Sequence, residues 1–162
     1  MNIITLLGSP RRKGNTATML GLFENLAASY CTVERINLVD VKIHGCRGCN
    51  TCQKKVHEPG CIQKDDFLIV LNRLLAADVI VYASPLYVWS FSAQMKALLD
   101  RQYCLAKWNE ETQSVISLLA GKRTALLVTC GGSEKEDADL IKTTFDRAMA
   151  FVSCKVVGKY IV

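Results

Sequence analysis

Along the chain, short apolar or alternating segments typical of strands take turns with segments in which apolar residues recur at helical spacing. Short apolar or alternating runs predict strands at residues 2–8, 31–39, 78–83, 122–130 and 154–162. Apolar residues at helical spacing predict helices at residues 16–29, 67–77, 93–103 and about 133–149. Strands that alternate with helices are typical of a parallel sheet covered on both faces.

This order of elements predicts an α/β fold in one domain over residues 1–162, a doubly wound sheet of five parallel strands in the order 2-1-3-4-5. We expect Asp65 or Asp66, Ser92 and Ser133 to cap the three later helices. The pattern contains no helix after the last strand, which leaves apolar strand residues uncovered. Either more chain or a second copy would cover them, and we therefore predict a homodimer or homotetramer.

Composition and charge narrow the class of protein further. The formal net charge is +5, but the cations are scattered outside the first loop and no nucleic-acid-binding motif is present, so we expect no nucleic-acid partner. No apolar run is long enough to cross a bilayer, and the first cations follow the first apolar run, unlike those of a signal peptide. We therefore predict a cytoplasmic protein with no membrane partner.

Ligands of doubly wound sheets bind at the carboxyl ends of the strands, beside the switch point. Three loops of unusual composition leave strands at this edge: "GSPRRKGNT", "ASPLYVWSFS" and "TCGGSE". The first places three consecutive cations after a buried strand, yet its glycines lack Walker spacing and it has no dinucleotide fingerprint. Because it opens a helix, its backbone N–H groups favour a terminal phosphate, with further bonds from Ser9, Arg11, Asn15 and Thr16. The alternative is a solvated turn.

The second and third loops suit a planar ring. Pro85 stiffens the second loop, in which Leu86, Tyr87 and Trp89 form a flat apolar surface. In the third loop we expect the amides of Gly131 and Gly132, beside Cys130, to approach a ligand closely. The alternatives are that the aromatic residues pack in the core or against a second subunit, and that the glycines only form a tight turn.

Four of the eight cysteines lie in a polar loop over residues 44–64: Cys46, Cys49, Cys52 and Cys61. The first three have the tight spacing of iron–sulfur ligands in bacterial ferredoxins, and we expect Lys54 and Lys55 to offset thiolate charge. Three interpretations stay open: a [4Fe–4S] cluster, free or redox-active thiols, and structural zinc.

The segments "GSPRRKGNT", "SPLYVWSFSAQMKALLDR" and "TCGG", in this order, resemble the flavodoxin-fold NAD(P)H-dependent FMN reductases. With "GCRGCNTC" and a later "GC" before "IQKDDF", the chain resembles the iron–sulfur flavoprotein branch of that family. The resemblance implies a flavodoxin-like sheet, an FMN phosphate on the first loop, an isoalloxazine ring bordered by Pro85, Leu86 and Tyr87, a [4Fe–4S] cluster in the cysteine loop and an oligomer.

The predicted function is therefore that of an FMN-dependent oxidoreductase. It would take a hydride from NAD(P)H and pass electrons to a quinone, flavin, iron or protein acceptor, with no catalytic side chain because the flavin carries the chemistry. Two alternatives stay open: a non-enzymatic electron carrier of flavodoxin type, and a cysteine-rich redox or zinc module without flavin.

Overall fold

The structure, a computed structural model, describes all residues 1–162. Five parallel strands form its main sheet in the order β2-β1-β3-β6-β7: β1 (Asn2–Leu7), β2 (Thr32–Asn37), β3 (Val79–Pro85), β6 (Arg123–Thr129) and β7 (Lys155–Ile161). Counted within this sheet, the order is the predicted 2-1-3-4-5. The prediction of a doubly wound α/β fold is confirmed.

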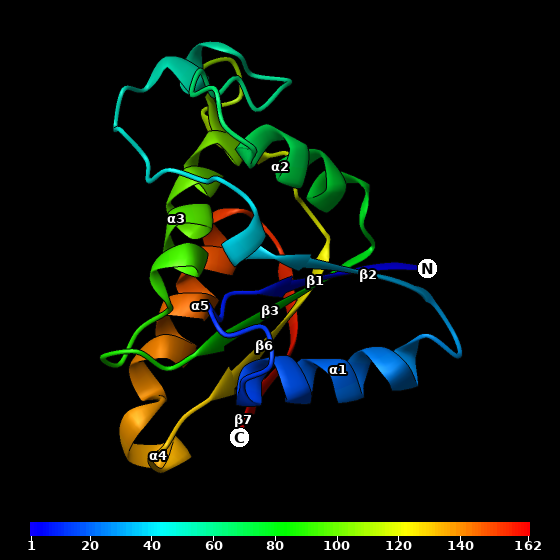
Figure 1. Ribbon diagram of the computed structural model, residues 1–162. Coiled ribbons are helices and arrows are strands. Elements are labelled where there is room, and N and C mark those ends of the chain that lie inside the picture. The colour runs from blue at the N-terminus through cyan, green and yellow to red at the C-terminus, as the bar shows by residue number, and fades with distance from the viewer.

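Helices cover both faces of the sheet (Figure 1). They are α1 (Asn15–Ala27), α2 (Phe67–Ala76), α3 (Ala93–Arg101), α4 (Glu134–Asp137) and α5 (Asp139–Phe151). A core cluster of 8 buried residues lies between α1 and the sheet, whereas a cluster of 25 lies on the face covered by α2, α3 and α5. The helices α1, α2, α3 and α5 thus each bury an apolar stripe on a sheet that is apolar on both faces, whereas the short α4 buries no residue. No helix follows β7.

Both predicted serine caps are present. The hydroxyl of Ser92 accepts a hydrogen bond from the Met95 N–H at 3.3 Å, and that of Ser133 accepts one from the Glu136 N–H at 3.1 Å. At α2, Asp66 occupies the N-cap position, but its carboxylate accepts from the Lys42 N–H; the Asp65 carboxylate accepts instead from the Phe67 N–H, the first of the helix, at 3.2 Å, so of the two predicted residues Asp65 supplies the side-chain cap. The last helix also differs, because Ala138 separates the short α4 from α5.

A two-stranded antiparallel hairpin, which the pattern did not predict, follows α3. It pairs β4 (Ala106–Asn109) with β5 (Ser114–Ser117), and each strand has only four residues. Such short strands carry too few alternating positions for a clear period of two. Three 3₁₀ turns complete the chain: η1 (Leu38–Asp40), η2 (Thr51–Lys54) and η3 (Gln102–Leu105).

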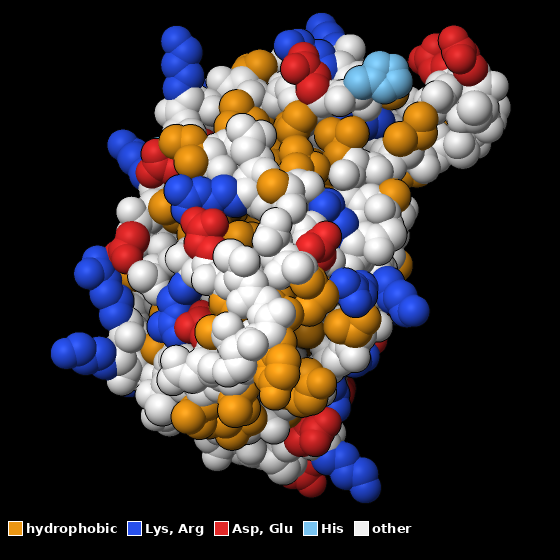
Figure 2. Space-filling model, turned by 90° about the vertical axis from the view of Figure 1, so that its right-hand side faces the viewer, with side chains coloured by type: hydrophobic (Ala, Val, Ile, Leu, Met, Phe, Trp, Pro, Cys, Tyr) orange, Lys and Arg blue, Asp and Glu red, His pale blue; other side chains and the backbone are white.

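The surface carries charges of both signs. Figure 2 shows acidic and basic side chains interspersed on one face, with hydrophobic side chains between them. The net positive charge is therefore not concentrated into a single basic field on this face. No helix has the length and apolar character needed to cross a membrane.

Candidate functional site at the carboxyl edge of the sheet

Backbone hydrogen bonds hold the three predicted loops side by side at the carboxyl edge of the sheet. They join Gly8 N–H to Ala83 O at 2.7 Å, Leu86 N–H to Thr129 O at 2.9 Å and Cys130 N–H to Val162 O at 2.9 Å. Each bond continues the ladder of a neighbouring strand pair into the loop. The sheet itself therefore fixes how the loops lie relative to one another.

Gly8 stands where the first loop meets β3 and α3. A Cβ atom here would lie 3.0 Å from the Cβ of Met95, 3.0 Å from the hydroxyl of Ser92 and 3.1 Å from the carbonyl oxygen of Ala83. The Ser92 hydroxyl also donates a 2.6 Å hydrogen bond to the Gly8 carbonyl. A side chain at this position would therefore force these neighbours to shift by a few tenths of an ångström.

The first loop presents an unneutralised positive end. Its last residue, Gly14, is the N-cap of α1 and offers no side-chain acceptor to the helix's first N–H groups, and the first turn has no acidic residue. Arg12 forms an ion pair with Asp40, whereas Arg11 forms none. An N-terminal helix dipole beside a free guanidinium favours an anion.

The remaining hydroxyls of this loop are already oriented. Ser9 is buried, and its Oγ accepts from the Arg11 N–H at 3.1 Å, which holds the loop in a turn. Thr16, also buried, has its Oγ1 2.7 Å from that of Thr129. The Ser9 Oγ also donates to the Arg11 carbonyl oxygen at 3.2 Å, whereas only one of the two threonine hydroxyls donates in the Thr16–Thr129 bond, which leaves the proton of the other free.

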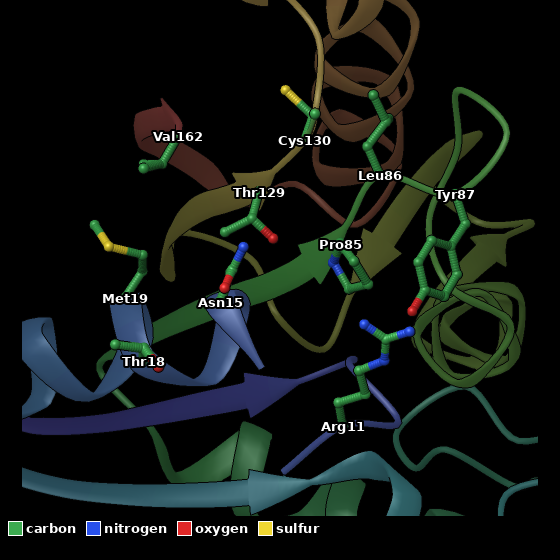
Figure 3. A pocket seen from close by; sticks show the side chains of 11 residues that line it. Arg11, Asn15, Thr18, Met19, Pro85, Leu86, Tyr87, Thr129, Cys130 and Val162 are labelled. Carbon is green, nitrogen blue, oxygen red and sulfur yellow. The ribbon is translucent and has the colours of Figure 1, made fainter. Parts of the chain in front are cut away.

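A cavity of about 540 Å³ lies between the three loops. Figure 3 shows Arg11, Pro85 and Tyr87 on one side and Met19 and Val162 on the other, with Asn15 and Thr129 between them. The full lining is Arg11, Asn15, Thr18, Met19, Pro85, Leu86, Tyr87, Thr129, Cys130, Gly131 and Val162. Its volume is in the range of small-molecule and cofactor sites.

Two smaller cavities adjoin the first and share residues with it. One, of about 170 Å³, adds Ser9, Gly14 and Thr16 of the first loop and the start of α1. The other, of about 230 Å³, extends past Leu86 and Cys130 to Val88, Trp89, Gly132 and Asp137. The three cavities share lining residues and together form one cleft, here called the rim cleft, which is polar at the first loop and apolar at its centre.

All eleven residues predicted for cofactor binding thus line the rim cleft, but at different places. Trp89 and Gly132 lie only in its outer cavity, and Trp89 is about half exposed. Sequence reasoning missed Thr18, Met19, Thr129 and Val162. A helical projection of the first loop's helix would have found Thr18 and Met19, because they follow Asn15 by three and four positions.

The second loop contains a tight turn with unusual backbone angles. Tyr87 and Ser90 exchange two backbone hydrogen bonds of 3.0 Å, while Val88 and Trp89 between them have φ values of 49° and 56°. A β-branched residue rarely adopts this conformation, and such strain concentrates at ligand clamps. Both side chains point to the surface, where Val88 is 85% exposed.

The cysteine loop forms a separate site near the C-terminal end of α3, whereas the first loop contacts the N-terminal end of this helix (Figure 1). Its four cysteines line one narrow cavity of about 20 Å³ together with Arg101, Tyr103 and Cys104. No three His, Cys, Asp or Glu side chains converge in the geometry of a metal site. The cavity is too small for a multi-atom group as the loop stands, with Cys46 and Cys49 exposed and Cys52 buried.

The cations beside this cavity are not those that the sequence suggested. Lys55 pairs with Glu58 at the surface, and the buried cations are Arg101 and Lys107. Burial acts to lower the pKa of Arg101, but its hydrogen bonds to Asp65 and Cys61 outweigh burial and raise that pKa. Burial lowers the pKa of Lys107 and raises that of the Cys52 thiol.

The strand order and the position of the rim cleft define a flavodoxin-like α/β protein. Among solved structures, an NAD(P)H:quinone oxidoreductase from Methanothermobacter marburgensis superposes with a TM-score of 0.72 at 20% identity, over 99% of this chain and 85% of that one. An azoreductase from Bacillus anthracis has a TM-score of 0.71 at 17% identity, over 98% and 86% of the two chains. Both similarities concern the fold.

The chain belongs to the family of NADPH-dependent FMN reductases, because the sequence model of that family matches residues 1–160. An iron-sulfur flavoprotein from Archaeoglobus fulgidus is 36% identical over 102 residues, which are 62% of this chain and 45% of that relative. One from Methanocaldococcus jannaschii is 37% identical over 102 residues, 62% of this chain and 51% of the relative. The chain thus spans about half the length of these curated relatives.

Proposed function

We propose that the chain binds FMN in the rim cleft and serves as an NAD(P)H-dependent oxidoreductase. The phosphate would lie against the N-terminus of α1, held by Ser9, Arg11, Asn15 and Thr16. The ring would lie against Pro85, Leu86 and Tyr87, with Cys130, Gly131 and Gly132 at its edge and Trp89 outside it. Bound FMN would supply the chemistry, by taking a hydride from the nicotinamide and releasing the electrons to an acceptor.

One observation carries this proposal: a single cleft joins an unpaired cation at an uncapped helix N-terminus to an apolar floor. A phosphate monoester attached to a planar apolar ring matches both ends. Membership of the FMN reductase family favours the same cofactor. The roles of this chain's residues are to bind the flavin, to orient its ring and to keep one ring face open to a second substrate.

The experiment is a titration of the purified chain with FMN, followed by assay of NADH and NADPH oxidation with quinone, dye and ferric acceptors. We expect saturable FMN binding and acceptor-dependent oxidation of at least one nucleotide. Flavin binding without nucleotide oxidation would favour a flavodoxin-type carrier, whose flavin bleaches only when a separate reductase is added. Absence of flavin binding would contradict the proposal.

As a second part of the function, the four loop cysteines would hold a [4Fe–4S] cluster that relays single electrons. The donors have the right chemistry, because four thiols line one cavity and the buried Arg101 beside them has an Nε atom with no acceptor; binding would require the four sulfurs to converge further than they do in the structure. The iron-sulfur flavoprotein names of the relatives favour the same group. Anaerobic protein without iron and acid-labile sulfide would rule out the cluster and leave the flavin proposal standing.

The state of the protein in the cell completes the proposal. We propose a homodimer or homotetramer, because β7 exposes half or more of the Val157 and Tyr160 side chains; sedimentation at micromolar concentration tests this. A cytoplasmic location agrees with the eight cysteines, all of which are free thiols in the structure.

A further inference from the structure

Two buried cations stand beneath the cysteine loop, but only one buried carboxylate accompanies them. Arg101, at the end of α3, is 2% exposed, and Lys107, on β4, is fully buried. The buried Asp65 side chain pairs with Arg101, while Lys107 has no carboxylate partner. The buried charges therefore do not cancel. An uncompensated buried charge is costly, which indicates that the site is built to hold further negative charge.

Arg101 is held in a fixed orientation that directs an N–H group at a sulfur atom. Its Nη1 donates to the Asp65 carboxylate and, at 3.3 Å, to the His44 carbonyl, while its guanidinium lies 4.0 Å above the Phe67 ring centre. Its Nη2 donates to the Cys61 Sγ at 3.2 Å. Its Nε is buried without any acceptor. A thiolate is the stronger acceptor for such a donor.

Lys107 acts on the other side of the same cavity. Its ammonium donates to the carbonyl oxygens of Cys52, at 2.6 Å, and Pro59, at 3.0 Å. These two residues flank the turn that returns the chain to Cys61, where Gly60 has a φ of 66°. Lys107 thus fixes the backbone that carries two of the four cysteines and also brings a positive charge close to their sulfurs.

We propose that Arg101 and Lys107 are the counter-cations of the four-thiolate site, and that they raise the reduction potential of the cluster it holds. This inference rests on the proposed cluster. Hydrogen bonds to ligand sulfurs and positive charge nearby favour the more negative, reduced form. Neither residue ligates iron; both position the ligands and set the charge around them. Cys61 is the ligand that receives the direct hydrogen bond.

A purely structural role for the same residues makes a different prediction. An Asp65–Arg101 pair that only ties the loop to α3 would need no thiolate, and it would leave the charge of Lys107 uncompensated. It would also give Asp65→Asn and Arg101→Gln the same consequence, a looser loop. The electrostatic role instead predicts opposite consequences, because the two substitutions remove charges of opposite sign.

The test is a dye-mediated redox titration of the full chain after anaerobic reconstitution with ferrous iron and sulfide. We would compare the wild-type protein with Arg101→Gln, Lys107→Met and Asp65→Asn, and follow cluster absorbance while dithionite is added. The matched control is Arg73→Gln, which removes the same charge from a half-exposed ion pair with Glu34. Iron, sulfide and FMN binding would be measured on every sample.

We expect Arg101→Gln and Lys107→Met each to shift the midpoint to more negative potential by at least about tenfold in the one-electron equilibrium, about 59 mV. Asp65→Asn should shift it the other way, and Arg73→Gln should leave it unchanged. Arg101→Lys, which keeps the charge without the planar fork, should give an intermediate shift and serves if Arg101→Gln does not fold.

Unchanged potentials in variants with full iron content would overturn the inference while the cluster proposal stands. Shifts of the same sign for Arg101→Gln and Asp65→Asn would overturn it equally, in favour of a structural tie. A wild-type chain that takes up no iron or sulfide is a distinct result. It would remove the cluster itself, and the inference with it, before any variant is compared.

Discussion

The rim cleft and the cysteine loop are two sites of one chain that are built in opposite ways. At the rim cleft, backbone hydrogen bonds from neighbouring strands place every loop. The cysteine loop runs between η1 and α2 with only the four-residue η2 inside it, and side chains from α3 and β4 hold it in place. The difference is between a site placed by topology and a site placed by a few buried charges.

The two sites should therefore differ in how well they tolerate amino-acid substitutions. Backbone ladders survive most side-chain substitutions, so the rim cleft is sensitive mainly where the backbones approach closely. The cysteine loop has few regular backbone bonds and depends on Arg101 and Lys107 to stay in place. The predictions below test this difference, from the largest expected effect to the smallest.

The rates at which two cysteines react with maleimide distinguish the exposed side of the cysteine loop, represented by Cys49, from the buried side, represented by Cys104. Hydrogen bonds with Thr51 lower the pKa of the exposed Cys49, whereas burial raises the pKa of Cys104 to about 12. A lower pKa means more thiolate, so in iron-free protein at pH 8 Cys49 should react with maleimide roughly 10³ times faster or more. Peptide mass spectrometry measures both rates. Comparable rates in the folded protein would show that the inner side is open.

Substitution of one glycine in each region tests how closely the backbone is packed there. Gly8→Val should cost about 3 kcal/mol of unfolding free energy and abolish FMN binding, because its Cβ meets atoms of three neighbours. Gly45→Val in the cysteine loop should change stability by less than about 0.5 kcal/mol, since nothing lies within 4 Å of a Cβ there. Urea unfolding measures both. Equal costs would contradict the contrast.

Two adjacent arginines test the phosphate end of the rim cleft. Arg11→Gln should weaken FMN binding about 10- to 100-fold, the value of a hydrogen bond to a charged group, and leave riboflavin binding unchanged because riboflavin has no phosphate. Arg12→Gln, which removes only the surface pair with Asp40, is the control and should change neither. Fluorescence titration gives the affinities. A matching loss for riboflavin would place Arg11 at the ring instead.

Two serine caps give the smallest expected effect. Ser92→Ala should destabilise the protein by about 1–2 kcal/mol, because it removes both the α3 cap and the hydrogen bond to Gly8. Ser133→Ala at the exposed, four-residue α4 should cost less than half as much. Midpoints of denaturant unfolding measure both losses of stability. A larger loss for Ser133→Ala than for Ser92→Ala would contradict the prediction.

The sheet and the rim cleft could both be predicted from the sequence, because both follow from the order of the strands. Buried parallel strands are continuous apolar runs, and the loops at their carboxyl ends must meet whatever their side chains do. Residues such as Thr129, at the last position of β6, were missed because the pairing of the strands brings them to the cavity. The sequence around them has no unusual composition that would have drawn attention to them.

The surroundings of the cysteine loop could not be predicted in this way. Lys107 lies 46 positions after Cys61 on a hairpin whose four-residue strands gave no signal, and Arg101 ends a helix that reads as amphipathic. Only tertiary packing brings them beneath the thiols. The nearby Lys54 and Lys55 were the natural candidates by position, but a long exposed side chain finds a surface partner such as Glu58 at less cost than burial.

Helix α3 has a consequence for both sites at once. Its N-cap, Ser92, donates a hydrogen bond to Gly8 in the first loop, and its nine residues, Ala93–Arg101, end beside the thiols. At the rise of an α-helix, this rod is about 13 Å long. One rigid helix therefore fixes the distance between Ser92, which is bonded to the first loop, and Arg101, which is bonded to Cys61, so a shift of α3 would move contacts of both sites together.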